Sequence, residues 1–252
     1  MPSLLWNLYA RCYDRITGLL PYQEMLDEVV GALDLRPGMR VLDAGCGTGA
    51  LAERLAARHP DIELVAADLS PAMLKRARTR RAWPASFNFV EGNIDDVLAS
   101  DERGFDRIAS VNVIWTLPDP ENTFARMTAR LRDDGRMVHT TPIWRLRAHA
   151  IVWRHLCGHK GWARMRALGG LPMLAVAGLL NLLLLVQGRV SARAPHARRR
   201  WHADGLAELL RAVGAPPTVI RPCYAGQDML LVCAKEVADP CAPRLPGPAK
   251  HL

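Results

Sequence analysis

Residues 43–49 combine a carboxylate with closely spaced glycines, which suits the binding of a charged ligand. They read DAGCGTG and follow the short apolar run Val41-Leu42. Glycines let the backbone approach a ligand closely, because no Cβ intervenes. Asp68 stands 19 residues after Gly49, at the end of the next apolar run, where a carboxylate can accept hydrogen bonds from both hydroxyls of a ribose. The spacing predicts a nucleotide-like ligand at the carboxyl edge of a parallel sheet.

The acidic residue ahead of the glycines narrows the class of ligand. The spacing Gly45-x-Gly47-x-x-Ala50 also satisfies the relaxed fingerprint of dinucleotide-binding proteins. Spacing alone therefore does not separate the two classes. Asp43 would repel a diphosphate, whereas it would attract a cofactor that carries a cationic sulfonium and an ammonium group. The sequence favours the cationic ligand.

Strand and helix patterns alternate around this segment. Strands are expected at 41–42, 62–67, 87–90, 105–112 and 135–140, and again at 217–221 and 227–235. Helices are expected from about residue 51, and at 71–80, 121–131 and 204–213, with Ser70 as an N-cap and Pro71 at the first helical position. Residues 1–30 read as one or two helices, the second opened by Pro21. This alternation predicts an α/β protein with a parallel sheet.

Five segments in order carry a family resemblance: LRPGMRVLDAGCGTG, VAADLS, VEGNIDD, FDRIASVNVIWTLPDP and LRDDGRMV. The series resembles the class I S-adenosylmethionine-dependent methyltransferases, strongly over residues 36–141 and weakly over 204–235. Within that family, the motifs are most similar to those of the small-molecule branch, which includes the ubiquinone/menaquinone biosynthesis and bacterial phospholipid methyltransferases. The resemblance implies an enzyme that uses S-adenosyl-L-methionine. It also implies a doubly wound, seven-stranded, mostly parallel sheet of the Rossmann-like methyltransferase fold.

The resemblance also assigns roles to matching residues. Asp68 would bind the ribose hydroxyls, with Leu69 beside the adenine. The residues implied at the methionine end of the cofactor and in its loop are Asp43, Gly45, Cys46 and Gly47.

Further roles lie outside the glycine-rich loop. Asn93, where the family often has Asp, and Ile94 would flank the adenine, and Asn112 would lie under the methionine portion. Tyr9 and Tyr13 resemble the N-terminal tyrosines that close over the site in this branch, although aromatic residues at this spacing also simply pack on an amphipathic helix.

Residues 142–203 form an insertion after the fifth strand, and we expect it to be mainly helical. It holds eleven Arg or Lys and no acidic residue, although the rest of the chain is mildly acidic. Residues 167–188 carry no charge, with basic residues on both sides. A single membrane crossing is rejected, because the last two strands must return to the same sheet.

Three interpretations of the insertion remain open. It lies in a membrane interface through residues 164–200, caps a pocket for an apolar substrate, or forms a core or dimer contact. The predicted acceptor is accordingly a small apolar or lipid-like molecule. The alternatives are a soluble natural-product methyltransferase whose insertion is a lid or dimer contact, and a non-catalytic scaffold that binds the cofactor. The oligomeric state stays open.

The remaining chemistry-bearing residues give weaker signals. His139, at the end of the fifth strand, is the candidate base if the acceptor must lose a proton. The histidines and cysteine of HLCGH (155–159) lack the spacing of a structural zinc site, so no metal is predicted. No nucleic-acid partner is expected, because long apolar runs do not suit a surface that follows phosphates. Six cysteines without paired spacing, and no export signal, predict a cytoplasmic protein, with peripheral contact at the inner face of the membrane in the interfacial interpretation.

These signals divide the chain into five parts. We expect an N-terminal helical cap at 1–35, a cofactor-binding core at 36–141 and the insertion at 142–203. Residues 204–236 complete the core, and residues 237–252, which contain four prolines, form a disordered tail.

Overall fold

The computed structural model describes residues 10, 13–142, 147–160 and 203–235. Its strands are β1 (Arg40–Ala44), β2 (Glu63–Asp68), β3 (Phe87–Glu91), β4 (Phe105–Val111), β5 (Leu131–Pro142), β6 (Pro217–Cys223) and β7 (Asp228–Ala234). Its α-helices are α2 (Leu20–Leu33), α3 (Ala50–Arg58), α4 (Pro71–Thr79), α5 (Ile94–Ser100), α6 (Pro120–Arg130), α7 (Ala148–Cys157) and α11 (Ala203–Ala212). Two short 3₁₀ helices are η1 (Ile114–Thr116) and η2 (Tyr224–Gly226). Residues 13–17 are also helical.

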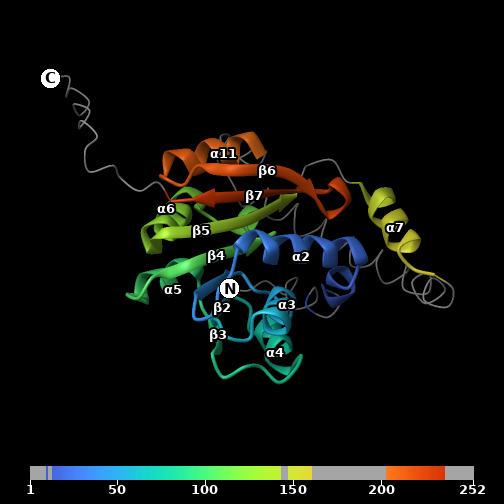
Figure 1. Cartoon of the computed structure of the whole chain (residues 1–252), viewed down its shortest axis with the longest axis horizontal. Coiled ribbons are helices and arrows are strands. Elements are labelled where there is room, and N and C mark those ends of the chain that lie inside the picture. Colours follow the sequence, from blue (N-terminus) through green and yellow to red (C-terminus); the bar gives the residue numbers. More distant parts are fainter. Residues whose placement is uncertain (1–9, 11–12, 143–146, 161–202, 236–252) are drawn as a thin grey trace.

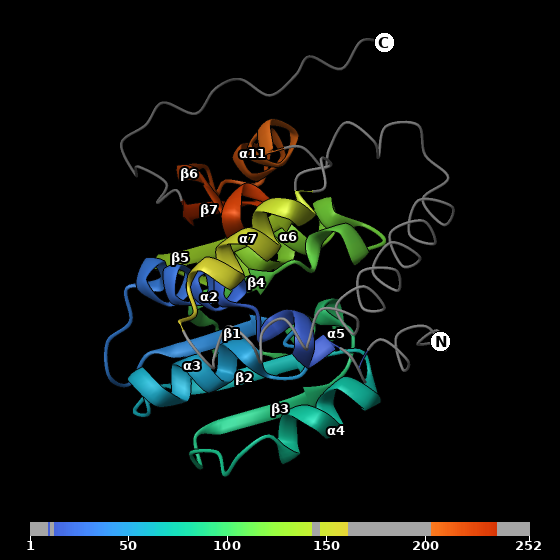
Figure 2. The same ribbon diagram turned by 90° about the vertical axis from the view of Figure 1, so that its right-hand side faces the viewer.

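All seven strands form one sheet in the order β3-β2-β1-β4-β5-β7-β6, which Figure 2 shows from bottom to top. Strands β1 to β5 are parallel, whereas β7 runs antiparallel between β5 and β6. The strand order reverses direction between β1 and β4, and open α/β sheets bind ligands in the crevice at such a point. The predicted seven-stranded, mostly parallel sheet is confirmed.

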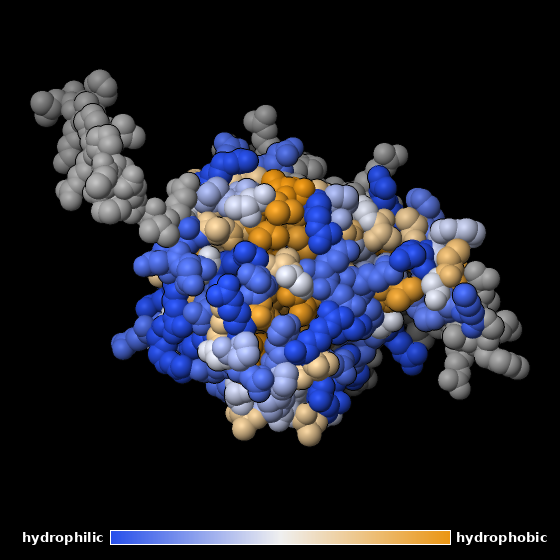
Figure 3. Space-filling model, in the orientation of Figure 1, coloured by the Kyte–Doolittle hydropathy of each residue, from blue (hydrophilic) through white to orange (hydrophobic). Residues whose placement is uncertain are grey.

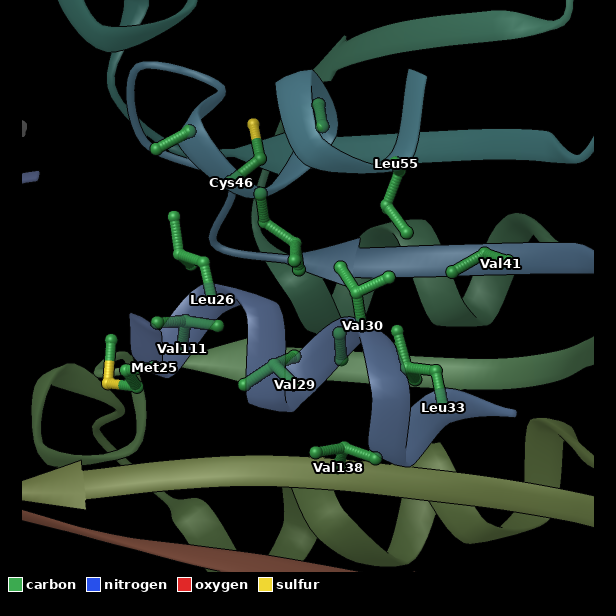
Figure 4. Close-up of a cluster of buried hydrophobic side chains, with 14 of the residues drawn as sticks. Met25, Leu26, Val29, Val30, Leu33, Val41, Cys46, Leu55, Val111 and Val138 are labelled. Carbon is green, nitrogen blue, oxygen red and sulfur yellow. The ribbon is translucent and has the colours of Figure 1, made fainter. Parts of the chain in front are cut away.

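Helices cover both faces of the sheet (Figure 1). On one face, α2 and α3 pack with β1, β4 and β5, and Figure 4 shows Val29, Val30 and Leu33 of α2 lying among strand residues such as Val41 and Val138. On the other face, α5, α6 and α11 enclose a second apolar cluster. With both faces covered, the central strands are largely buried, and their apolar residues divide between the two clusters.

Local sequence signals place most helix starts correctly. The Ser70 side chain accepts a hydrogen bond from the Met73 N–H at 3.4 Å, and Pro71 opens α4. Pro21 lies in the first turn of α2. In contrast, α5 was not predicted, because its seven residues, IDDVLAS, are too few to display a helical repeat.

Helix α7 begins the insertion and packs on the amino end of α2 (Figure 1). The Leu20 N–H donates to His155 Nδ1 at 3.1 Å, and Arg154 pairs with Glu24. This helix agrees with the mainly helical character expected of the insertion. The apolar run 167–188 and the tail 237–252 lie outside the described residues, so the division of the chain into parts stays a prediction.

Figure 3 shows the face of the molecule that is turned to the viewer in Figure 1. This face is largely hydrophilic, with hydrophobic residues in the region of β6 and β7. Val219 and Ile220 of the edge strand β6 are among the exposed hydrophobic side chains. Within the described ranges, no helix combines the length and apolar character needed to span a membrane.

Candidate active site

The turn between β1 and α3 depends on its glycines. Gly45, Gly47 and Gly49 have φ of 81°, 55° and 81°, in the left-handed region that side chains with a Cβ rarely adopt. A Cβ at Gly45 would also collide with the Val113 side chain, and one at Gly47 would lie 3.2 Å from the Tyr13 ring. The loop is therefore closely packed against the segment after β4 and against the N-terminal helix.

Asp43 lies at the carboxyl end of β1 and is 1% exposed. Its Oδ2 atom has no hydrogen-bond partner among the described residues. Burial, and then the charge of Asp68, raises the pKa of Asp43 to about 7. A buried carboxylate without a partner is costly, and a cationic ligand would relieve that cost. Asp43 therefore fits an ammonium or sulfonium group.

Asp68 joins the end of β2 to the glycine-rich loop. Its Oδ2 accepts from the Gly47 N–H and its Oδ1 from the Ser70 N–H, both at 2.8 Å. Burial raises the pKa of Asp68, against the lowering effect of these two N–H groups. An ionised carboxylate has about four acceptor positions, so the group retains capacity for the hydroxyls of a ribose.

A small pocket opens between α2 and the glycine-rich turn. The Tyr13 and Tyr22 hydroxyls are 3.1 Å apart at its edge, and burial raises the pKa of Tyr13 to about 12. Four of the predicted cofactor residues meet here. The pocket is lined by Tyr13, Tyr22, Leu26, Asp43, Gly45, Cys46, Ala50, Leu51 and Val111.

The residues predicted beside the adenine follow β2 and β3, whose ends lie side by side. Leu69 is 59% exposed immediately after Asp68, and the Gly92 N–H donates to the Asp68 carbonyl oxygen at 3.1 Å. Asn93 is the N-cap of α5, and its Oδ1 accepts from the Asp95 N–H at 3.2 Å. Ile94 is buried against the sheet. The Asn93 side-chain oxygen thus already has a partner in the backbone of α5.

Asn112 follows β4 with a left-handed backbone, at φ 57°. Its Nδ2 donates to Asp228 Oδ2 at 2.7 Å. Asp228 was not predicted, nor was Tyr22. The sequence carries no signal for either, because their place at the site depends on how β7 and α2 pack.

His139 lies in the middle of the sheet on the face covered by α6. It is buried edge-on against Phe124, with 4.8 Å between ring centroids, and burial lowers its pKa to about 3. Neither ring nitrogen has a hydrogen-bond partner within the described part of the chain. These surroundings are those of a packed side chain, so the role of a base stays a prediction without structural support.

Other predicted residues lie apart from the pocket. His155 and His159 contact each other edge-on, with 4.7 Å between ring centroids, on and just after α7. In the described ranges no three His, Cys, Asp or Glu side chains gather as a metal site. Tyr9 lies outside the described residues.

Comparison with known proteins agrees with this geometry. The family described as "Methyltransferase domain" matches residues 41–135. Trans-aconitate 2-methyltransferase of Variovorax paradoxus (strain S110) is 31% identical over 231 residues, which cover 86% of this chain and 82% of that protein. Malonyl-[acyl-carrier protein] O-methyltransferase of Paenibacillus sp. (strain JDR-2) is 30% identical over 105 residues, 40% of this chain and 38% of that protein.

Solved structures share the fold. The N-methyltransferase NodS from Bradyrhizobium japonicum WM9, in complex with S-adenosyl-L-homocysteine, superposes with a TM-score of 0.55 at 17% identity. The match covers 88% of this chain and 90% of that one. Taken with the sequence relatives, the glycine-rich turn and the pocket at Asp43, this likeness identifies the chain as a class I S-adenosylmethionine-dependent methyltransferase of the small-molecule type.

Proposed function

We propose that this methyltransferase acts on a small apolar or lipid-like acceptor, which it takes from a membrane surface through residues 164–200. The observation that carries the proposal is the position of α7. This helix packs on the start of α2, which supplies Tyr22 and Leu26 to the pocket, and it presents Trp153 with 71% exposure. In the sequence, residues 158–166 separate this helix from the uncharged run 167–188, which has basic residues on both sides.

The walls of the pocket combine apolar side chains, such as Leu26, Leu51 and Val111, with Asp43 and two tyrosines, and no Lys or Arg of the described residues lines them. A polycarboxylate such as the acceptor in the name of the Variovorax relative would thus find no cationic partner in this part of the site. The alternative is a soluble acceptor under a lid formed by the insertion, and the similarity along most of the Variovorax protein favours it.

For the donor, we propose that the residues of the glycine-rich turn hold the methionine end. Asp43 would bind the cationic groups of the donor. The backbone of Gly45, Cys46 and Gly47 would contact the donor closely. Asp68 would accept from the ribose hydroxyls.

The remaining donor contacts are also proposals. Leu69, Asn93 and Ile94 would border the adenine, and Asn112 would lie under the methionine portion. Tyr13, with Tyr9, would cover the site and exclude water.

The cofactor supplies an activated methyl group on its sulfonium, so the task of the chain is alignment. Positioning alone can contribute roughly 7–11 kcal/mol to a reaction of this kind. Tyr13 packs against Gly47 and Val113 packs against Gly45. These two contacts would keep the glycine-rich turn in the conformation that holds the donor. A base is needed only where the nucleophile of the acceptor carries a proton that must leave.

Vesicle sedimentation of the full chain tests the membrane part of the proposal. Vesicles that contain phosphatidylglycerol should bind the protein, whereas vesicles of phosphatidylcholine alone should bind it weakly, because each Lys or Arg near an anionic surface contributes about 1 kcal/mol. Reversing Arg198, Arg199 and Arg200 to Glu should abolish binding. Reversing three exposed residues on separate helices, Lys75, Arg126 and Arg211, is the matched control and should have a much smaller effect.

Methyl incorporation distinguishes the two acceptors. With S-adenosylmethionine labelled on its methyl group and a bacterial lipid extract, the proposal expects label in the organic phase. If the protein ignores both kinds of vesicle and labels only water-soluble molecules, the membrane proposal is wrong and the soluble alternative stands.

A further inference from the structure

Asp228 is a fully buried carboxyl group that lies at the first position of β7. It is 1% exposed and stands opposite Pro142 of β5 and Cys223 of β6. Asn112 Nδ2 donates to Asp228 Oδ2 at 2.7 Å. Strand β7 thereby contacts the segment after β4, which borders the donor site.

Charge makes this placement unusual. Burial raises the pKa of Asp228 to about 7 and the hydrogen bond from Asn112 lowers it, with no contribution from a cationic side chain in the described part of the chain. Burial, with a smaller contribution from the charge of Asp228, raises the pKa of Tyr13, Tyr22 and Tyr224. A carboxyl group in such surroundings costs stability, so its presence is better explained by a role in the site than by a role in the core.

Asn112 is held at both ends. Its backbone N–H points at Thr140, at 3.2 Å from the carbonyl oxygen and 3.1 Å from Oγ1, and its side chain is held by Asp228. With φ at 57°, the residue occupies a backbone region that Asn tolerates better than most residues but that still carries strain. Such a conformation persists where its surroundings fix it.

The turn at Asn112 determines where the next side chain points. Val113 lies against Gly45, so closely that a Cβ on Gly45 would collide with it. The chain of contacts therefore runs from Asp228 through Asn112 and Val113 to the glycine-rich turn. A carboxylate on β7 is linked in this way to the backbone beside Asp43.

We propose that Asp228 is a positioning residue for methyl transfer, which fixes the turn at Asn112 and so holds Val113 against the donor loop. It acts on the donor through Asn112 and does not need to touch the acceptor. The assignment depends on the donor site and is independent of whether the acceptor is a lipid.

A swap of the two groups tests this role, with S-adenosylhomocysteine as the probe in calorimetric titration. Asn112→Asp alone would place two carboxyl groups face to face, and binding should weaken about tenfold or more. Combining Asn112→Asp with Asp228→Asn restores one donor and one acceptor, since the amide introduced at 228 donates to the carboxyl group introduced at 112. Most of the lost affinity should return, as coupled pairs show in double-mutant cycles.

The control is Val232→Ala, a cavity in the same strand away from the site. It should lower the melting temperature while leaving the affinity unchanged, which separates positioning from mere stability. If the combined variant binds as weakly as Asn112→Asp alone, or if Asn112→Asp binds like wild type, the proposal is overturned. Failure of vesicle binding would leave this result untouched.

Discussion

Carboxylates of this protein fall into two groups with opposite chemistry. Glu63, Asp101 and Asp106 form ion pairs with arginines, and hydrogen bonds and charges from those arginines hold their pKa values below the ordinary range. Asp43 and Asp228 are buried, form no ion pair with the residues that the structure describes, and have pKa values that burial raises to about 7. The residue type is therefore not informative by itself, because the surroundings decide whether a carboxylate serves the fold or a ligand.

The first prediction concerns the pH dependence of donor binding. A cationic ligand favours ionised Asp43, so affinity for S-adenosylmethionine should fall as the pH drops below about 7, by up to about tenfold per unit. Calorimetric titration between pH 5.5 and 7.5 measures this. Asp43→Asn should bind weakly and with a flatter profile, and a steep profile in that variant would exclude Asp43 as the source.

The same shift has an opposite effect on stability. The native pKa of Asp43 lies above its ordinary value of 3.8, so the folded state binds more protons than the unfolded state between about pH 4 and 7. This group therefore makes the free energy of unfolding decrease as the pH rises through that window, by up to about 1.4 kcal/mol per unit. Urea denaturation of Asp43→Asn should lack this contribution.

Among the elements, the short helix at residues 13–17 is fastened to the core beside the site. Asp14 forms an ion pair with Arg76 of α4 and, at 3.0 Å, with Arg80, which follows α4. Arg80 Nε also lies 2.7 Å from Glu53 of α3. The adjacent Tyr13 rests on Gly47. The ion pairs of Asp14 thus hold the adjacent Tyr13 in place over Gly47.

The second prediction tests this attachment. Asp14→Asn should release the helix, lower S-adenosylhomocysteine affinity several-fold and make binding less sensitive to salt, while costing only about 0–1 kcal/mol of stability. Asp27→Asn is the matched control. Its side chain is 35% exposed against 30% for Asp14, and it pairs with Arg54 and Arg58 on α3, away from Tyr13. Equal effects of the two variants on affinity would contradict the attachment.

At the scale of the whole molecule, the residues that stabilise the fold through ion pairs and the residues proposed to bind the donor lie at opposite edges of the sheet. At the amino edge, Arg40 lies 2.8 Å from Glu63 and 2.6 Å from Asp101, and it donates to the Gly104 carbonyl oxygen at 3.0 Å. These contacts join β1 and β2 to the turn before β4. The carboxyl edge instead carries the glycine-rich turn and Asp43, whose Oδ2 atom has no hydrogen-bond partner among the described residues.

The third prediction follows from that separation. Arg40→Met should lower the free energy of unfolding by about 1.5–3 kcal/mol, because Asp101, whose side chain is 12% exposed, loses its arginine, while Glu63 keeps Arg103. Affinity for S-adenosylhomocysteine should stay unchanged at a temperature where the variant is folded. Arg103→Met, which removes an arginine 63% exposed that pairs with the same Glu63, should cost at most about 1 kcal/mol. A loss of affinity in folded Arg40→Met would show that the two edges are coupled.

The sequence by itself determined the features whose causes are local. The strand, glycine-rich turn and helix at 40–58, the N-cap at Ser70 and the proline that opens α2 follow from residues within a few positions of one another. These features, with the order of the motifs, sufficed for the fold, the cofactor and the class of enzyme. The short helix α5 was missed because seven residues show too little periodicity.

Only the tertiary structure decided which distant residues meet. Asp228 reaches Asn112 because β7 inserts antiparallel between β5 and β6, and nothing in the residues near position 228 specifies that neighbour. His139 could not be assigned to a face, because β5 is buried on both faces and its residue pattern does not distinguish them. Packing of α2 brings Tyr22 to Tyr13 for the same reason. Contacts between elements depend on how whole faces bury their apolar surface, and single segments of the chain do not encode them.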